Sequence, residues 1–222
     1  ESSLELFPCF SKQDVVRLVN PLSQDLSIMR TSMFFTGLET IKYNLNRQLS
    51  NLKLFEFGKT YSLQENKYLE TEKLTLFSSG VFQGNSWSEK SQQINFFLMK
   101  GILHKLLDKF ISPDFDFKIK EINQSYSKYS LAYYFEKKKI IEVGQFDDQV
   151  LRKVSIKQPV YYIDIDFDLL MKHMNSLNSQ YVSLSKFPSV RRDLSLLVDQ
   201  SVSYLDIETS IQKISNHLLK DV

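Results

Sequence analysis

The sequence predicts an α+β fold in which helices flank an antiparallel sheet. Segments with the 3.6-residue period of helices are interleaved with segments whose apolar residues alternate, as in strands. Two apolar strands on either side of three lysines predict a hairpin, the connection that antiparallel sheets use. Of the 222 residues, 42% are hydrophobic and 24% are charged, which is ordinary for a globular protein with a buried core.

The first long periodic segment predicts a helix over residues 32–49. Its apolar residues recur every three or four positions and therefore lie on one helix face: Phe34, Leu38, Ile41, Leu45 and Leu49. The period then changes to two. Over residues 53–61 the rings of Phe55 and Phe57 alternate with other side chains, as in a partly buried strand, and residues 74–81 predict a second strand.

A second helix is predicted over residues 92–110, and Pro113 prevents its continuation. Its predicted apolar stripe consists of Ile94, Phe97, Leu98, Ile102, Leu103, Leu106 and Phe110. Gly101 lies inside this helix, where glycine costs about 1 kcal/mol relative to alanine, so we expect close packing at that position. Strands over residues 131–136 and 140–146 flank the three lysines and form the predicted hairpin.

A linker rich in serine and asparagine is predicted over residues 175–186. Before it we expect a helix, a strand and a helix over residues 146–154, 160–166 and 166–174. After it, alternating apolar residues predict a strand over residues 192–199. Ser203 followed by Asp206 resembles a capping box, and it opens a helix whose apolar stripe extends to Leu218.

Composition and charge restrict the function. The chain has 28 basic and 26 acidic residues, and a net charge of +2 argues against a strongly cationic nucleic-acid binder, so any RNA contact would be local. The single cysteine, Cys9, fits a reducing compartment, and no apolar run approaches the length of a membrane span. The start at Glu1 lacks the features of a signal peptide and resembles a cut inside a longer protein.

Patterns for catalysis and metal binding are weak. Cys9 has no local signature that pairs it with a histidine, so structural roles are expected for it and for His104, His173 and His217. Asp164 to Asp168 resemble the start of a calcium loop, but the loop's glycine and final glutamate are missing, so a helix cap at Asp166 or Asp168 is expected instead. No Gly-x-Gly occurs, which excludes a dinucleotide-binding fingerprint. Residues 137–139, all lysine, are either a solvated turn or a local RNA contact.

Several stretches, in one order, resemble a known family. Residues 20–23 read Asn-Pro-Leu-Ser, residues 29–32 read Met-Arg-Thr-Ser and residues 54–58 read Leu-Phe-Glu-Phe-Gly. Ser-Trp follows at 86–87, and residues 186–193 read Lys-Phe-Pro-Ser-Val-Arg-Arg-Asp. Together these stretches span nearly the whole chain and are similar to the β subunits of bacterial phenylalanyl-tRNA synthetases.

The resemblance implies a class II synthetase-like module without catalytic chemistry over residues 1–180 and the start of a ferredoxin-like anticodon-binding domain over 181–222. Class II enzymes hold ATP with an arginine on the motif 2 strand and with a glycine-rich motif 3. If residues 58–61 occupy the motif 2 strand, the arginine position falls near Ser62, and motif 3 has no counterpart. A His-Pro-Gly-like segment of the family is replaced at residues 129–132 by Tyr-Ser-Leu-Ala.

The resemblance also implies the partners. They are the synthetase α subunit, with which the β subunit forms an α2β2 assembly, and phenylalanine tRNA. The expected location is the cytoplasm, and no membrane partner is expected. The holoenzyme uses ATP and magnesium, whereas no cofactor, catalytic residue or metal ligand is expected in this chain. Arg191 and Arg192 are the best candidates for RNA phosphate contacts. The alternatives are a stand-alone RNA-binding module and a class II-like enzyme with an unrecognised site.

Overall fold

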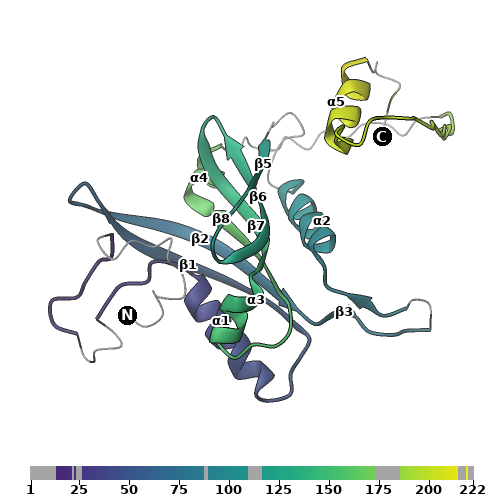
Figure 1. The fold of residues 1–222 in the computed structure, drawn as a ribbon. Helices are drawn as coiled ribbons and strands as arrows, with labels where there is room; N and C mark the ends of the chain where they lie inside the picture. Colours follow the sequence, from purple (N-terminus) through teal and green to yellow (C-terminus); the bar gives the residue numbers. More distant parts are fainter. Residues whose placement is uncertain are drawn as a thin grey trace. The chain divides into compact units, whose positions relative to one another are not determined.

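The computed structural model describes residues 14–21, 23, 27–87, 90–109, 117–173, 186–214 and 219. The chain divides into two compact units, Glu1–Asn178 and Ser179–Val222 (Figure 1). In chain order the elements are α1 (Phe34–Leu45), β1 (Leu52–Gln64), β2 (Lys67–Ser79), β3 (Val81–Gln83), β4 (Gln92–Gln93), α2 (Phe96–Leu107), β5 (Lys118–Ile122), β6 (Ser127–Phe135), β7 (Lys138–Phe146), α3 (Asp148–Lys153), β8 (Val160–Asp166), α4 (Phe167–His173) and α5 (Tyr204–Ile214). No helix in the described part of the chain has the length and apolar character needed to cross a membrane.

The first unit is built on a six-stranded sheet in the order β1-β2-β8-β7-β6-β5. Every neighbouring pair in this sheet is antiparallel. Helices α2 and α4 contribute to the apolar cluster on one face, and α1 and α3 contribute to the cluster on the other. The predicted α+β class with an antiparallel sheet and flanking helices is therefore confirmed.

Strands β1 and β2 form a longer hairpin than the sequence predicts. Each strand has 13 residues, and the two pair in register along their whole length. Glu65 and Asn66 make the two-residue turn with φ values of 48° and 62°, the left-handed conformation that tight hairpins require. The expected strands over 53–61 and 74–81 were too short because no glycine marks this turn.

Strand β1 buries the side opposite to its aromatic rings. Leu52 is 7% exposed, whereas Phe55 and Phe57 are 75% and 52% exposed. The ring side of β1 belongs to the sheet face that α2 covers, but α2 packs on β7 and β8 and not on the terminal strand β1. The rings of β1 therefore remain largely in solvent, contrary to the partial burial that alternation suggests.

Helix α1 packs its first turn into an aromatic cluster. The Phe34 ring lies 4.8 Å from the Tyr162 ring and 5.1 Å from the Phe146 ring, measured between centroids. A Cβ on Gly37 would overlap the ring of Phe77, so glycine lets the helix approach the sheet. The helix ends at Leu45, four residues before the predicted end, and Leu49 is exposed.

Helix α2 begins later than predicted because Asn95 caps it. The Asn95 side chain accepts a hydrogen bond from the Leu98 backbone N–H at 2.9 Å. The predicted stripe is wrong at Phe97, which is 80% exposed, and the helix buries Met99, Leu103 and Leu107. Close packing at Gly101 is also wrong, since a Cβ there would meet nothing within 4 Å.

The later elements of the first unit follow the prediction closely. Strands β6 and β7 form the expected hairpin, and β8 has the predicted bounds. Asp147 caps α3 by accepting from the Gln149 N–H at 2.7 Å, and Asp166 caps α4 by accepting from the Leu169 N–H at 3.0 Å. The cap expected at Asp166 is confirmed.

The second unit contains a helix but, within the described residues, no strand. The strand expected over Arg192–Asp199 is wrong, since residues 188–199 have no regular secondary structure and no neighbouring strand to pair with. The capping box is confirmed: the Asp206 N–H donates to Ser203 Oγ at 3.3 Å, and the Ser203 N–H donates to Asp206 Oδ2 at 3.2 Å. Helix α5 is described as far as Ile214.

A carboxylate is buried in the middle of the sheet. Glu142 on β7 is 2% exposed, and its Oε1 accepts from the hydroxyls of Tyr126 at 2.8 Å and Tyr162 at 2.7 Å. Its Oε2 accepts from Lys139 Nζ at 2.6 Å. Burial, followed by the Glu142 charge, raises the pKa of Tyr162 well above its ordinary value. Three donors therefore satisfy a group whose burial without partners would be costly.

We expect Tyr162→Phe to lower the free energy of unfolding by about 1–3 kcal/mol near pH 7, because it removes a donor from a buried carboxylate. A tyrosine whose pKa is raised by folding stabilises fully below its unfolded pKa of about 10, and this contribution falls as the pH rises toward the folded value. Urea unfolding should be measured near pH 7 and above about pH 10. The free energy of unfolding should fall more between these pH values in the wild type than in the variant. Tyr68→Phe, at an exposed position, is the control. Identical pH profiles for wild type and Tyr162→Phe would contradict this assignment.

Candidate functional site

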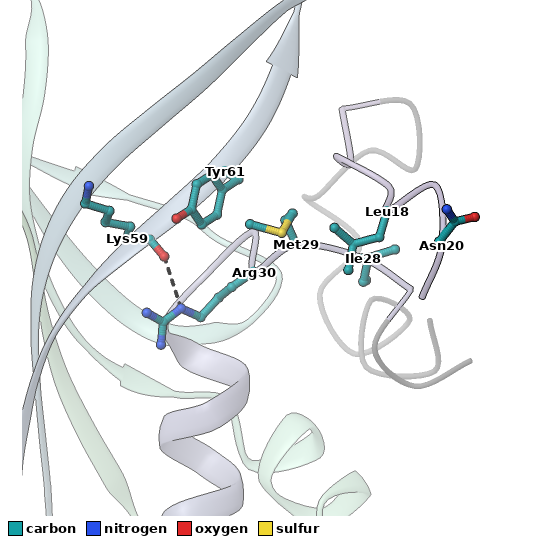
Figure 2. A pocket seen from close by; sticks show the side chains of 7 residues that line it. All are labelled: Leu18, Asn20, Ile28, Met29, Arg30, Lys59 and Tyr61. Atoms are coloured by element: carbon teal, nitrogen blue, oxygen red, sulfur yellow. Dashed lines mark hydrogen bonds between the residues drawn. The ribbon is translucent and has the colours of Figure 1, made fainter. Parts of the chain in front are cut away.

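A hollow of about 590 Å³ lies between residues 18–20 and 28–30 on one side and the outer part of β1 on the other (Figure 2). It is lined by Leu18, Asn20, Ile28, Met29, Arg30, Lys59 and Tyr61. The segment before α1 is held to this edge of the sheet by backbone hydrogen bonds, from the Tyr61 N–H to the Arg30 carbonyl and from the Leu63 N–H to the Asp14 carbonyl, both at 2.8 Å. The hollow therefore combines side chains from two of the family-like stretches of the sequence.

Arg30 joins the Met-Arg-Thr-Ser stretch at residues 29–32 to the Leu-Phe-Glu-Phe-Gly stretch at residues 54–58 on β1. Its Nη1 donates to Glu56 Oε1 at 2.5 Å, and its Nε donates to the Lys59 carbonyl at 3.1 Å (Figure 2). The guanidinium also lies across Gly58, where a Cβ would overlap Arg30 Nη2. Thr36 at the start of α1 donates to the second oxygen of Glu56 at 3.4 Å. We call Arg30, Glu56 and Gly58 the arginine interlock.

The interlock accounts for the residue types in both stretches. A planar guanidinium can donate to a carboxylate and a carbonyl at once, which the ammonium of a lysine matches poorly. Glycine at position 58 leaves room for that group, and glutamate at position 56 neutralises it. Arg30, Glu56 and Gly58 all occur in the family-like stretches at residues 29–32 and 54–58. Their mutual contact was not predicted, because Arg30 and Glu56 are 26 residues apart in the chain.

The second cation at the hollow is also paired. Lys59 Nζ lies 2.5 Å from Glu70 Oε1, on the neighbouring strand. The hydrogen bond and the charge of Glu70 raise the pKa of Lys59 above its ordinary value. Both cations of the lining, Arg30 and Lys59, are thus paired with a carboxylate, and neither is left unpaired to take a phosphate. The remaining lining of the hollow is largely apolar.

The other candidate residues do not converge on this hollow. Ser62, where the motif 2 arginine was expected to fall, is a β1 residue. Asp164 on β8 accepts from Thr75 at 2.7 Å and lies 3.4 Å from Lys73. His104 lies 3.1 Å from the Tyr133 hydroxyl. Cys9 and His217 lie outside the described residues.

The donor set does not fit a bound metal. Across the part of the chain that the structure describes, no group of three or more His, Cys, Asp or Glu side chains could hold an ion. The carboxylates that the calcium-loop resemblance singled out, Asp164 and Asp166, instead face the ammonium of Lys73 at 3.4 and 3.8 Å. No step through magnesium is therefore derived from these residues.

The predicted RNA-contact residues lie in the second unit. Arg191 and Arg192 are exposed and precede α5 in a segment without regular structure. Arg191 Nε lies 3.7 Å from Asp193 Oδ1, and both side chains are more than 90% exposed. An ion pair this exposed contributes little to stability. The guanidinium groups of Arg191 and Arg192 are both accessible to solvent and to a ligand.

Two exposed aromatic rings form a further surface feature. Phe55 and Phe57 stand exposed next to each other on one face of the terminal strand of the sheet, at 75% and 52%. The Phe57 ring meets the Phe167 ring edge to face at 4.5 Å between centroids. We call Phe55 and Phe57 the edge patch. Large apolar side chains exposed next to one another on a sheet face are a feature of interaction sites.

Comparison with known proteins identifies the family. The family model described as the phenylalanyl tRNA synthetase beta chain CLM domain matches residues 2–167. A phenylalanine–tRNA ligase beta subunit of Bacteroides fragilis is 32% identical over 99% of this chain and 28% of its own length. The corresponding protein of Bacteroides thetaiotaomicron is 31% identical over 96% of this chain and 27% of its own length. The chain thus spans a little over a quarter of the length of these relatives.

Solved structures agree on the fold. The crystal structure of pyrrolysyl-tRNA synthetase from Desulfitobacterium hafniense covers 77% of this chain and 58% of its own, with a TM-score of 0.55. Its sequence identity is 12%, so the likeness concerns the fold alone. It supports the synthetase-like architecture of the sheet and its helices. Because the family model matches most of its length, the chain belongs to the family of phenylalanyl-tRNA synthetase beta chain CLM domains.

Proposed function

We propose that this chain is part of the β subunit of a phenylalanine–tRNA ligase, the assembly that attaches phenylalanine to its tRNA with ATP. The match of residues 2–167 to the family model carries the proposal. The partners are the α subunit, in a cytoplasmic α2β2 assembly, and phenylalanine tRNA. This chain contributes to subunit packing and tRNA positioning, and ATP and magnesium act in the holoenzyme.

The arginine interlock supports a role without chemistry. Class II catalysis requires an arginine that is available to the phosphates of ATP, and the arginine in the signature of this chain is held by Glu56 and the Lys59 carbonyl. Freeing it would leave Glu56 without its ion pair. The signature residues thus serve the architecture of the module.

The second unit supports the tRNA part of the proposal. We assign residues 181–222 to the beginning of a ferredoxin-like anticodon-binding domain, of which α5 is the first helix. Arg191 and Arg192 contact RNA phosphate there, since both are exposed and arginine donors suit phosphate oxygens.

The edge patch is the surface we assign to the α subunit. The relatives are named as subunits, and an exposed aromatic pair on the last strand of a sheet is a liability unless a partner covers it. Interfaces of permanent assemblies are larger and more hydrophobic than transient ones.

The purified chain should not catalyse pyrophosphate exchange with phenylalanine and ATP above the rate of a protein-free blank. The reason is that Arg30 is held by Glu56 and that the expected position of the motif 2 arginine falls near Ser62. A complete ligase of the same family is the positive control. Exchange above the blank that survives further purification would favour an enzyme with an unrecognised site.

Phe55→Ser together with Phe57→Ser should reduce co-purification of a co-expressed α subunit several-fold. The melting temperature should fall only slightly, because Phe55 is 75% exposed and Phe57 loses an edge-to-face contact with Phe167. Phe97→Ser, which removes an equally exposed ring from α2, is the matched control. Undiminished co-purification of the double variant would show that the α subunit binds elsewhere.

A further inference from the structure

The lysine run at residues 137–139 is part of a larger basic surface. Strand pairing places Lys118 opposite Tyr134 and Tyr134 opposite Lys139, so the three lie in a row across β5, β6 and β7. Lys120 lies two positions along β5 on the same face, and Lys137 lies in the β6–β7 turn. All four lysines are exposed. We call Lys118, Lys120, Lys137 and Lys139, with Tyr134 between them, the lysine strip.

The acidic residues nearest in sequence neutralise only part of the strip. Lys139 forms an ion pair with the buried Glu142, which also accepts hydrogen bonds from two tyrosines. Glu136 lies in the turn beside Lys137. Glu121 pairs with Leu131, so it lies on the opposite face of the sheet from Lys118 and Lys120. Four lysines against these two carboxylates leave the strip locally cationic, although the whole chain carries only +2.

The spacing of the strip suits a polyanion with a regular repeat. Residues two apart on a strand are separated by about 6.7 Å, and residues two strands apart by about 9.6 Å. These separations place Lys118, Lys120 and Lys139 at intervals comparable to those between phosphates along a nucleic-acid strand. Lys120 Nζ lies 5.9 Å from the centre of the Tyr134 ring, so an aromatic surface lies within the array.

We infer that the lysine strip binds the backbone of a single-stranded RNA segment, with Tyr134 as a platform for a base. A phosphate-tracking basic groove combined with an aromatic ring is the arrangement by which single strands are held without sequence preference. The Tyr134 ring favours RNA over an acidic protein as the partner, because an acidic protein surface would need only the charges of the lysines. The inference deepens the proposed role in tRNA positioning and rests on it for the source of the RNA.

The test compares two triple variants of equal charge. Lys118→Ala, Lys120→Ala and Lys137→Ala remove the strip and keep Lys139, which Glu142 needs. Lys42→Ala, Lys67→Ala and Lys153→Ala remove three exposed lysines elsewhere in the same unit. Fluorescence anisotropy of the full chain with a labelled mixed-sequence single-stranded RNA measures binding across a series of salt concentrations.

The strip variant should bind at least about 10-fold more weakly at low salt, and the slope of log affinity against log salt should fall by about 2, at roughly 0.7 per lost phosphate contact. The control triple should keep the wild-type slope. Tyr134→Leu should weaken binding about 5-fold or more with an unchanged slope, since stacking is not ionic.

Two results would overturn the inference. The first is an equal loss of RNA affinity in both triple variants, which would reduce the effect to net charge. The second is binding of labelled polyglutamate to the strip as tightly as RNA, which would assign it to an acidic protein. Co-purification of the α subunit is read in parallel, so the proposed subunit role and the RNA contact fail or stand separately.

Discussion

The first unit depends on one guanidinium group. Arg30 lies just before α1 and is fixed to β1 by Glu56 and by the Lys59 carbonyl, while Gly58 leaves the space that it fills. This contact ties the segment before α1 to the last strand of the sheet. Helix α1 begins four residues after Arg30, and its first residue, Phe34, enters the aromatic cluster.

The two faces of the sheet differ in what covers them. On the α1 face, the aromatic cluster adjoins the buried Glu142, whose tyrosine partner Tyr162 also packs against Phe34. On the opposite face, α2 covers the central strands and leaves the outer strand uncovered, which exposes the edge patch. The hydrogen-bonded Arg30 and the exposed edge patch agree with the proposed role of this chain as a supporting part of a larger assembly.

Sequence patterns predicted those structural features that depend on interactions between residues close together in the chain. The bounds of β8, the β6–β7 hairpin and the Ser203 capping box depend on residues close together in the chain, and all three were predicted. The outer face of β1 was not, because alternation gives two faces and only the position of α2 decides which is covered. The strand over residues 192–199 depends on a neighbour that the described residues do not supply. The interlock joins positions far apart in the chain, so the motifs revealed its members but not their contact.

The most direct test of the interlock compares two glycine-to-alanine variants by urea unfolding. Alanine at Gly58 would displace the Arg30 guanidinium from Glu56 and the Lys59 carbonyl, so the free energy of unfolding should fall by about 1–3 kcal/mol. Alanine at Gly101, an exposed helix position where a Cβ meets nothing within 4 Å, should raise it by up to about 1 kcal/mol. A Gly58→Ala variant as stable as the wild type or more so would contradict the structural role assigned to the signature arginine.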